Sequence, residues 1–122
     1  MLTNANVMTS LATTDAERSR AFFETTLGLR CVEDGPYALV FDLNRIMLRI
    51  QKVDAFTPHP FTALGWLVED ITATVRDLTS RGIEFLRIGL PQDDLGIWDS
   101  GAGRIAWFKD PDGNTLSLTQ FN

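Results

Sequence analysis

The residues that most often carry out catalysis are few in this sequence and stand apart from one another. The chain has one histidine, His59, which lies between two prolines, and one cysteine, Cys31. Ser10 and Ser117 have no histidine or lysine placed to act as a base, and no Gly-x-Ser-x-Gly motif occurs. There is also no glycine-rich phosphate loop and no Cys/His cluster. These residues give no positive indication of catalysis.

The remaining side chains of interest are better suited to binding a ligand than to breaking bonds. Trp66, Trp98 and Trp107 offer flat apolar surfaces on which a planar or cationic ligand can stack. Arg49 offers a fixed positive charge for a carboxylate or a phosphate. Each also has a structural alternative: a tryptophan packs in a core or against another subunit, and an arginine forms an ion pair or a dimer contact. The elements that carry these side chains decide between the alternatives.

An internal repeat organises those elements. Each unit reads as a short alternating strand, an aspartate at a helix start, an amphipathic helix, a glycine that ends it, and three further strands. The aspartate and glycine are Asp15 and Gly28 in the first unit and Asp70 and Gly82 in the second. The sequence therefore predicts an α+β fold of two βαβββ modules. The predicted elements are strands at 8–13, 29–33, 37–43 and 45–52 with a helix at 16–27, then strands at 63–68, 83–88, 103–109 and 114–121 with a helix at 71–81.

The boundaries of the two modules follow from the repeat. A chain of 122 residues fits one domain, with module one at about 5–53, a linker at about 54–60 and module two at about 61–122. The linker contains two prolines. Module two also carries an insertion, residues 90–103, which is rich in Gly, Asp and Pro and has no counterpart in module one. Long irregular loops are often functional, and a solvated surface insertion is the equal alternative.

Two motifs within these modules resemble the vicinal-oxygen-chelate superfamily, which includes glyoxalases, bleomycin-resistance proteins and extradiol dioxygenases. The first helix ends in Phe-Phe-Glu-Thr-Thr-Leu-Gly28, and the last hairpin reads Trp107-Phe-Lys-Asp-Pro-Asp-Gly-Asn114. Together with the duplicated module, the likeness covers nearly the whole chain, and it is strongest to metal-free members of the bleomycin-resistance type. It implies that eight strands form a curled mixed sheet around a concave pit, with the helices on the outer face.

The resemblance also implies where a metal would be held. Metal-dependent members supply His, Gln or Glu from the first strand of each module and Glu near the end of the last strand. The matching positions in this sequence are Met8, Ala63, Ser117 and, in the first module, Arg49. None of them is the carboxylate, imidazole or thiolate donor that divalent metals prefer, and His59 in the linker cannot replace them. We therefore expect a metal-free pit, no cofactor and none of the metal-dependent chemistries of the superfamily.

Strand alternation predicts which side chains line that pit. It directs Ile46, Leu48, Ile50 and Trp66 to the core, and it places no carboxylate on the concave face. Trp98, in the insertion, is a candidate lid. The expected lining is apolar with a few polar groups, which is typical of a small-molecule site. The candidate ligand-binding residues are Met8, Ser10, Met47, Arg49, Gln51, Ala63, Gly65, Trp98, Ile105, Trp107 and Ser117.

The function favoured by this reasoning is metal-independent binding of a planar or aromatic ligand, with sequestration of an antibiotic or a metabolite. Arg49 and Lys109 in the pit fit poorly with a strongly cationic drug and favour a neutral or anionic ligand. One alternative is a metal-free lyase or isomerase of the same superfamily that uses Arg49 as an electrostatic stabiliser. The other is a protein-interaction module whose pit is vestigial.

Charge and composition limit the partners and the location. Sixteen acidic residues against eleven basic ones give a net charge of −5, which opposes nucleic-acid binding. No segment approaches the roughly 18 apolar residues of a membrane span, and no signal-peptide pattern is present. The single cysteine fits a reducing compartment, so we expect a cytoplasmic protein. The resemblance and the edges of strands 8–13 and 63–68 predict a homodimer.

Overall fold

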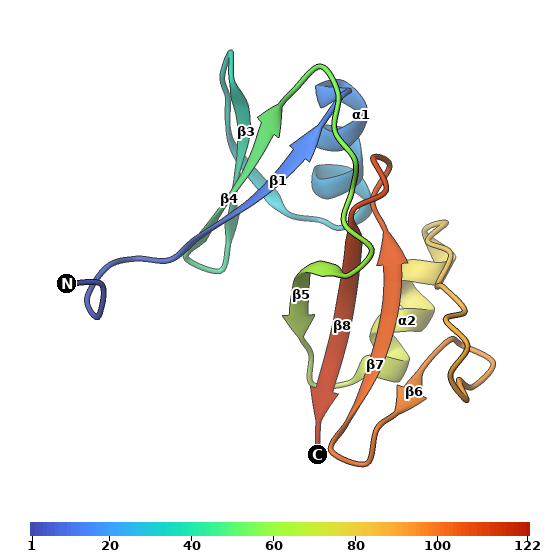
Figure 1. Ribbon diagram of the computed structural model, residues 1–122. Coiled ribbons are helices and arrows are strands. Elements are labelled where there is room, and N and C mark those ends of the chain that lie inside the picture. Colours follow the sequence, from blue (N-terminus) through green and yellow to red (C-terminus); the bar gives the residue numbers. More distant parts are fainter. The chain divides into compact units, whose positions relative to one another are not determined.

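The computed structural model describes residues 1–122 and divides the chain into two compact units (Figure 1). The units are Met1–Thr57 and Pro58–Asn122, so the boundary falls within the linker segment 54–60. Each unit contains one four-stranded mixed sheet and one helical segment. The α+β class and the two repeated modules predicted from the sequence are therefore confirmed.

Both modules follow the order strand, helix, three strands. Sheet A has the strand order β1-β4-β3-β2 and sheet B the order β5-β8-β7-β6. In each, the first strand of the module lies at an edge and runs parallel to the last strand, and the other pairs are antiparallel. The elements are β1 (Met8–Thr13), α1 (Ala16–Ala21), the π-helix η1 (Phe22–Thr26), β2 (Arg30–Asp34), β3 (Ala38–Leu43), β4 (Ile46–Lys52), β5 (Thr62–Leu67), α2 (Ile71–Ser80), β6 (Trp98–Asp99), β7 (Gly103–Lys109) and β8 (Thr115–Phe121).

The same two residue types bound the helical segment in both units. The side chains of Asp15 and Asp70 each accept a hydrogen bond from the backbone N–H three residues later, at 3.1 and 3.0 Å. These bonds satisfy N–H groups that have no partner within the helix. Gly28 and Gly82 follow the helical segments with φ angles of 73° and 95°, a left-handed conformation that glycine adopts at little cost. The predicted helix starts and stops are confirmed.

In the first unit the helical segment packs against one side of sheet A. Phe23 is fully buried there, and its ring lies 5.8 Å from that of Phe41 on β3. Leu48 and Ile50 of β4 are also fully buried, as predicted. Ile46 was predicted to join them, but it is 43% exposed. It is the first residue of β4, directly after a tight turn in which Asn44 and Arg45 have positive φ angles, so it lies at the end of the sheet.

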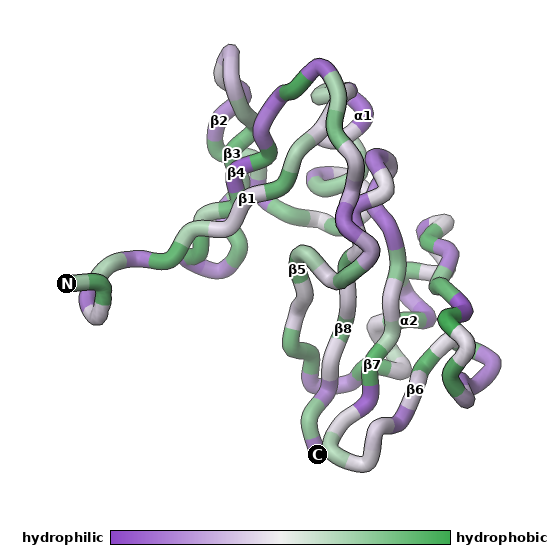
Figure 2. Tube along the Cα trace, in the orientation of Figure 1, coloured by the Kyte–Doolittle hydropathy of each residue, from purple (hydrophilic) through white to green (hydrophobic).

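In the second unit α2 packs in the same way against sheet B, behind β7 and β8 as drawn in Figure 1. The helix buries one apolar stripe, and the strands bury alternate residues opposite it. Figure 2 shows the corresponding alternation of hydrophobic and hydrophilic positions along β7 and β8. Trp66 lies on this covered side as predicted, stacked on Phe108 with ring centroids 6.4 Å apart. The buried residues of the two layers include Ile71, Val75, Leu78, Phe108, Leu116 and Leu118.

The predicted strand at 83–88 is wrong. The outer strand of sheet B is β6, which comes from the insertion and pairs with β7 through two residue pairs. Residues 83–88 make one backbone hydrogen bond to β7, from the Leu86 N–H to the Trp107 carbonyl at 2.8 Å. The Gln92 side chain forms the hydrogen bonds that a neighbouring strand would otherwise form with this segment. It accepts from the Ile88 N–H at 2.9 Å and donates to the Leu86 carbonyl at 2.8 Å. Because a side chain satisfies these groups, the segment does not pair as a strand.

The predicted helix at 16–27 is α-helical only as far as Ala21. Residues 22–26 form a π-helix, in which the Leu27 N–H donates to the Phe22 carbonyl five residues earlier, at 3.0 Å. The wider turn sets the rings of Phe22 and Phe23 edge to face at 5.1 Å. Hydrophobic periodicity does not reveal such a turn, because its apolar spacing differs little from that of an α-helix over five residues.

Ser19 is the one buried side chain whose hydroxyl lacks a hydrogen-bond partner. It lies on α1 and is 0% exposed. An unsatisfied buried hydroxyl costs about 1–3 kcal/mol, and alanine is the better helix former. We therefore expect Ser19→Ala to raise the free energy of unfolding by about 1 kcal/mol, measured by urea denaturation, and to raise Tm by a few degrees.

Thr13 provides the matched control, because it is 1% exposed but its hydroxyl is satisfied. It donates to the Asp15 carbonyl at 3.0 Å and accepts from the Asp15 N–H at 3.1 Å. Thr13→Ala should lower stability by about 1–2 kcal/mol, since it leaves the Asp15 groups without their partner. Loss of stability in both variants would show that the Ser19 hydroxyl is paired in solution.

Candidate functional site

Each sheet has one side that its own helix does not cover, which we call its open face. In sheet B the open face is opposite α2, because Leu116 and Leu118 of β8 point to the helix and are buried. The residues between them, and those in register on the neighbouring strands, therefore point the other way. The open face of sheet B thus carries Gly65 and Leu67 of β5, Thr115, Ser117 and Thr119 of β8, Ile105, Trp107 and Lys109 of β7, and Trp98 of β6.

The strand register brings these side chains into two rows across the sheet. One row runs from Gly65 through Ser117 to Trp107. The next row runs from Leu67 through Thr119 and Ile105 to Trp98. Residues that the sequence predicted for a binding site are therefore neighbours on one surface. Ala63, another predicted site residue, is exposed and lies at an irregularity in the β5–β8 register.

Two indole rings dominate the open face of sheet B. Trp98 and Trp107 stack with ring centroids 6.1 Å apart and ring planes 29° from parallel. Both side chains are half-buried. Such offset stacking is a favourable aromatic geometry and leaves ring surface and edges available to a third planar group. The structure thus joins two tryptophans that the sequence treated separately, and it places Trp98 in a strand instead of a loop lid.

A network of hydrogen bonds holds the insertion that carries Trp98. Besides its two bonds to the 86–88 backbone, the Gln92 side chain donates to the Gly96 carbonyl at 2.8 Å. Arg87 donates to the carbonyl oxygens of Asp93 and Asp94. The carboxylate of Asp93 accepts from the Leu95 N–H at 2.9 Å and from the Ile97 N–H. The insertion is therefore an ordered part of the module, and it holds Trp98 in position against Trp107.

Ser117 lies beside this pair with its side chain over Gly65. A Cβ atom at position 65 would come within 2.5 Å of the Ser117 hydroxyl oxygen, so glycine is the residue that permits the contact. Ser117 is only 7% exposed as a residue, but its hydroxyl oxygen, unlike that of Ser19, is not sealed from solvent, and it makes no hydrogen bond within the protein. A hydroxyl that has no protein partner and still reaches the surface is available to a ligand group.

The other predicted site residues lie together on the open face of sheet A. Parallel pairing places Met8 opposite Met47, Ser10 opposite Arg49, and Ala12 opposite Gln51. Met8 and Met47 are 50% and 46% exposed. Arg49 is half-buried and takes part in no ion pair. The predicted residues thus form two groups, one on each sheet.

The expectation that no carboxylate lies on an open face is wrong for sheet A. Asp42 of β3 is in register with Met47, so it shares the side of Arg49. Its carboxylate accepts the Arg45 N–H in the β3–β4 turn at 2.8 Å and lies 3.9 Å from the Arg30 guanidinium. The sequence could have suggested this role, because aspartate commonly bonds to turn backbone a few residues on. Asp42 is therefore occupied by the turn and is not a free base.

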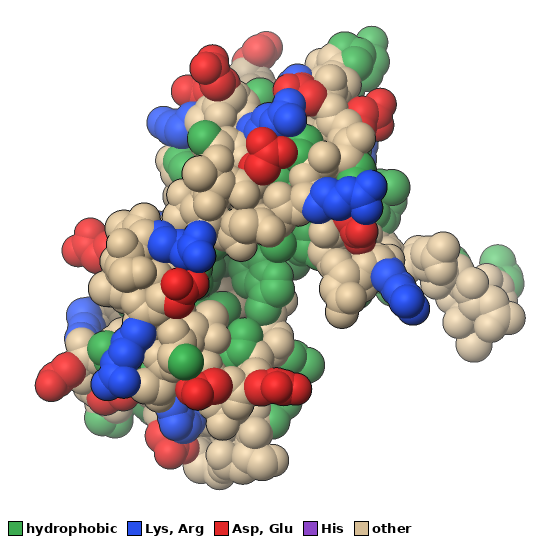
Figure 3. Space-filling view, turned by 180° about the vertical axis from the view of Figure 1, so that it is seen from behind, with side chains coloured by type: hydrophobic (Ala, Val, Ile, Leu, Met, Phe, Trp, Pro, Cys, Tyr) green, Lys and Arg blue, Asp and Glu red, His purple; other side chains and the backbone are tan.

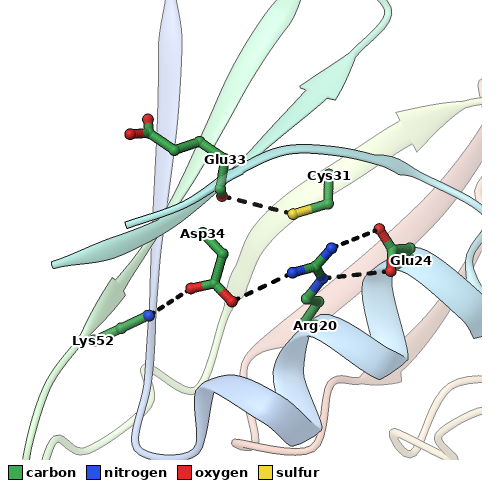
Figure 4. A network of polar contacts seen from close by, with 6 residues as sticks. All are labelled: Arg20, Glu24, Cys31, Glu33, Asp34 and Lys52. Atoms are coloured by element: carbon green, nitrogen blue, oxygen red, sulfur yellow. Dashed lines mark hydrogen bonds and ion pairs between the residues drawn. The ribbon is translucent and has the colours of Figure 1, made fainter. Parts of the chain in front are cut away.

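A polar network that the sequence did not indicate ties α1 to β2 and β4 (Figure 4). Arg20 contacts Glu24 and Asp34, each at 3.4 Å, and Lys52 donates to Asp34 at 2.6 Å. The hydrogen bond from Lys52 holds the pKa of Asp34 below its usual range. Cys31 lies next to this network, donating weakly to the Glu33 carbonyl. Apart from Arg20 and Glu24, which are four residues apart, the partners are distant in sequence, and all four side chains are partly exposed. The network therefore positions elements without marking a reaction centre.

The face drawn in Figure 3 carries no large patch of a single charge. Acidic and basic side chains are interspersed over the face seen in Figure 3. A basic stripe of the kind that tracks a nucleic-acid backbone does not occur on that face. None of the helices has the length and apolar character needed to cross a membrane.

Comparison with known protein families identifies one family model that matches most of the chain. Residues 7–118 match the family model of the Glyoxalase/Bleomycin resistance protein/Dioxygenase superfamily. The chain belongs to this superfamily. A search of curated protein sequences finds no significant match.

Solved structures of the superfamily share the fold at low sequence identity. A glyoxalase family protein of Bacillus anthracis is 17% identical, with a TM-score of 0.75 over 98% of this chain and 96% of that one. The lactoylglutathione lyase of Agrobacterium tumefaciens is 20% identical, with a TM-score of 0.69 over 96% and 93%. The fosfomycin resistance protein FosX of Listeria monocytogenes is 13% identical, with a TM-score of 0.77 over 100% and 96%. At these identities the likeness concerns the fold alone.

The positions that hold a metal in metal-dependent members of the superfamily carry other side chains in this protein. Met8 and Arg49 lie on the adjacent strands β1 and β4, and Ala63 and Ser117 on the adjacent strands β5 and β8. In each module the two positions for metal-binding side chains therefore lie on neighbouring strands. The donors do not fit, because a thioether, a guanidinium, a methyl group and a hydroxyl do not make a site for a divalent metal. No group of three or more His, Cys, Asp or Glu side chains in the structure could hold a metal ion.

The close approach of Gly65 and Ser117 can be tested by filling it. Gly65→Ala should destabilise the fold by about 1–3 kcal/mol, because the new methyl group meets the Ser117 hydroxyl at 2.5 Å. Adding Ser117→Ala should recover part of this loss, so that a double-mutant cycle measured by urea denaturation gives a favourable coupling.

Gly35→Ala is the matched control, since a methyl group there would meet its neighbours only at 3.5 Å or more. Its stability should stay within about 0.5 kcal/mol of the wild type. Additive effects of the changes at 65 and 117 would contradict the contact.

Proposed function

We propose that this protein binds a planar or aromatic small molecule without a metal, on the open face of sheet B. The Trp98–Trp107 pair carries the proposal, because its stacked indoles, with ring centroids 6.1 Å apart, place a large aromatic surface on the side of the sheet away from the helix. Small-molecule sites are mostly apolar, with a few polar groups that fix orientation. Ile105 and Leu67 extend the apolar surface, and the hydroxyl groups of the face supply the orienting groups.

Ser117 gives the proposed site its directional contact. Its hydroxyl lies one strand away from Trp107 and in register with it, without a protein partner. A ligand that stacks on Trp107 and carries a hydrogen-bonding group at its edge would pair with this hydroxyl. A hydrogen bond to a hydroxyl that has no partner within the protein favours such ligands over fully apolar ones. The proposal therefore concerns aromatic compounds that bear at least one polar substituent.

Sequestration of an antibiotic or a metabolite is the role that fits binding without turnover. FosX is named as a fosfomycin resistance protein, so the fold has been used for resistance to an antibiotic. In this chain the positions for metal ligands are occupied by residues that do not bind divalent metals, and no nucleophile is paired with a base. We therefore favour a binding protein over an enzyme.

A metal-free lyase or isomerase is the second candidate. The observation that favours it is Arg49, half-buried on the open face of sheet A with no ion-pair partner, where it could stabilise developing negative charge. One of the proteins with a similar fold is named as a lactoylglutathione lyase. Turnover of a vicinal-dicarbonyl substrate that is lost in Arg49→Gln would establish this function over sequestration.

The stacking role of Trp107 has a direct test. In the wild type, 2-naphthol should quench tryptophan fluorescence and raise Tm, and a ligand at a hundred times its Kd should add about 2.7 kcal/mol of stability. Trp107→Ala should weaken binding about three- to tenfold, corresponding to about 0.5–1.5 kcal/mol for one aromatic contact.

Trp66→Phe is the control, because Trp66 lies on the covered side of sheet B against Phe108. This variant should keep both the affinity and most of the quenching. If Trp107→Ala retained the full response, or if Trp66→Phe abolished it, the ligand would bind elsewhere.

Metal independence has its own test. The purified protein should hold no stoichiometric metal, and its Tm and naphthol affinity should not change with a chelator, because Met8, Ala63 and Ser117 are not metal donors. Elemental analysis is the measurement. About one Zn, Ni, Mn or Fe per chain, with loss of stability on chelation, would contradict the proposal.

A further inference from the structure

We infer that the aromatic ligand of sheet B carries an anionic group, which Lys109 binds. This inference rests on the proposed function and narrows it to a class of ligand. Lys109 is the last residue of β7, two positions after Trp107, so the two side chains leave the strand on the same side. Two residues of a strand span about 7 Å. The ammonium group is thus within reach of a substituent on a ring that stacks on Trp107.

Lys109 is a charge that the protein itself leaves unpaired. The sequence contains only two lysines, Lys52 and Lys109. Lys52 is held by Asp34 at 2.6 Å, whereas Lys109 is exposed and takes part in no ion pair. A lysine with a structural role would be expected to meet a carboxylate as Lys52 does. The charge of Lys109 is available to a partner from outside the chain.

The side chains around Lys109 favour a negatively charged partner. The strands of sheet B place no acidic side chain on the open face: Asp99 of β6 alternates with Trp98 and lies on the other side. Glu84, in the segment beside β7, forms no ion pair with Lys109. The neighbours of Lys109 on this face are Trp107 and, across the strand pair, the hydroxyl-bearing Thr115. Asp110 follows Lys109 directly, but its carboxylate accepts hydrogen bonds from the Asp112 N–H, the Asn114 N–H and the Asn114 side-chain amide within the turn. A carboxylate, sulfonate or phosphate on the open face would therefore meet a cation and a hydroxyl.

The resulting ligand class is an aromatic acid of one or two rings. The ring stacks on the Trp98–Trp107 pair, and the acidic group lies directly on the ring or within one or two bonds of it. Larger spacers would carry the anion past the end of β7, and a cationic substituent would be repelled by Lys109. Because Lys109 is exposed, the contact contributes a few-fold in affinity and is sensitive to salt.

The experiment compares two probes of nearly the same shape, the anion 2-naphthoate and the neutral 2-naphthamide. Their Kd values are measured by calorimetry and tryptophan fluorescence for the wild type, Lys109→Gln and Lys109→Arg. The wild type should bind the naphthoate about three- to fivefold more tightly than the amide, and about 1 M salt should remove the difference. Lys109→Gln should abolish the preference while leaving the amide affinity within about twofold, and Lys109→Arg should keep it.

Two further variants separate the local effect from general charge. Arg76→Gln, on the exposed side of α2, removes one positive charge from the same unit and should leave the preference intact. Arg49→Gln removes the half-buried cation on the open face of sheet A, which also forms no ion pair. A preference that survives Lys109→Gln, or that is lost in Arg49→Gln instead, would overturn the inference. Equal binding of both probes through Trp107 would overturn it and leave the proposed function standing, whereas binding of neither would remove both.

Discussion

In both units a helix can cover only one side of its four-stranded sheet, and the burial of that side fixes the character of the other. Phe23 and Phe41 in the first unit, and Phe108 with the α2 stripe in the second, remove large apolar side chains from water. Each such burial is worth about 1.5–3 kcal/mol, so a shift of one residue in strand register would be very costly. The alternate residues are held on the open face by that same register. Trp107, Ser117 and Lys109 are therefore positioned by the core, although they do not belong to it.

The sequence was sufficient for the features that depend on local chemistry. Asp15 and Asp70 predict where the helices begin, and Gly28 and Gly82 predict where they end. Few residue types can cap a helix or adopt a left-handed φ angle at its end. Alternation then placed Trp107 and Ser117 on the open face and Trp66 on the covered one. These predictions needed only the period of the element and the identity of one buried residue.

The features that the sequence did not reveal depend on contacts between distant residues. The segment at 83–88 has the alternating pattern of a strand, but the Gln92 side chain satisfies its backbone groups and the short β6 takes the edge of the sheet. Ile46 was assigned to the core by parity, yet it is exposed at the first position of β4, directly after the hairpin turn. The stacking of Trp98 on Trp107 depends on that unexpected edge strand, so the aromatic pair could not be predicted even though both residues were singled out.

We propose that this member of the superfamily binds its ligand on an aromatic surface and without a metal. The three tryptophans allow this claim to be tested in one titration, because the indole N–H of each gives a separate signal in a proton–nitrogen NMR spectrum. Signals are assigned with the single Trp→Phe variants, and 2-naphthoate is added to the labelled wild type. The account predicts that the signals of Trp98 and Trp107 shift together and saturate, while that of Trp66 stays in place. The largest shift at Trp66, or no shift at Trp98 and Trp107 at saturating ligand, would contradict it.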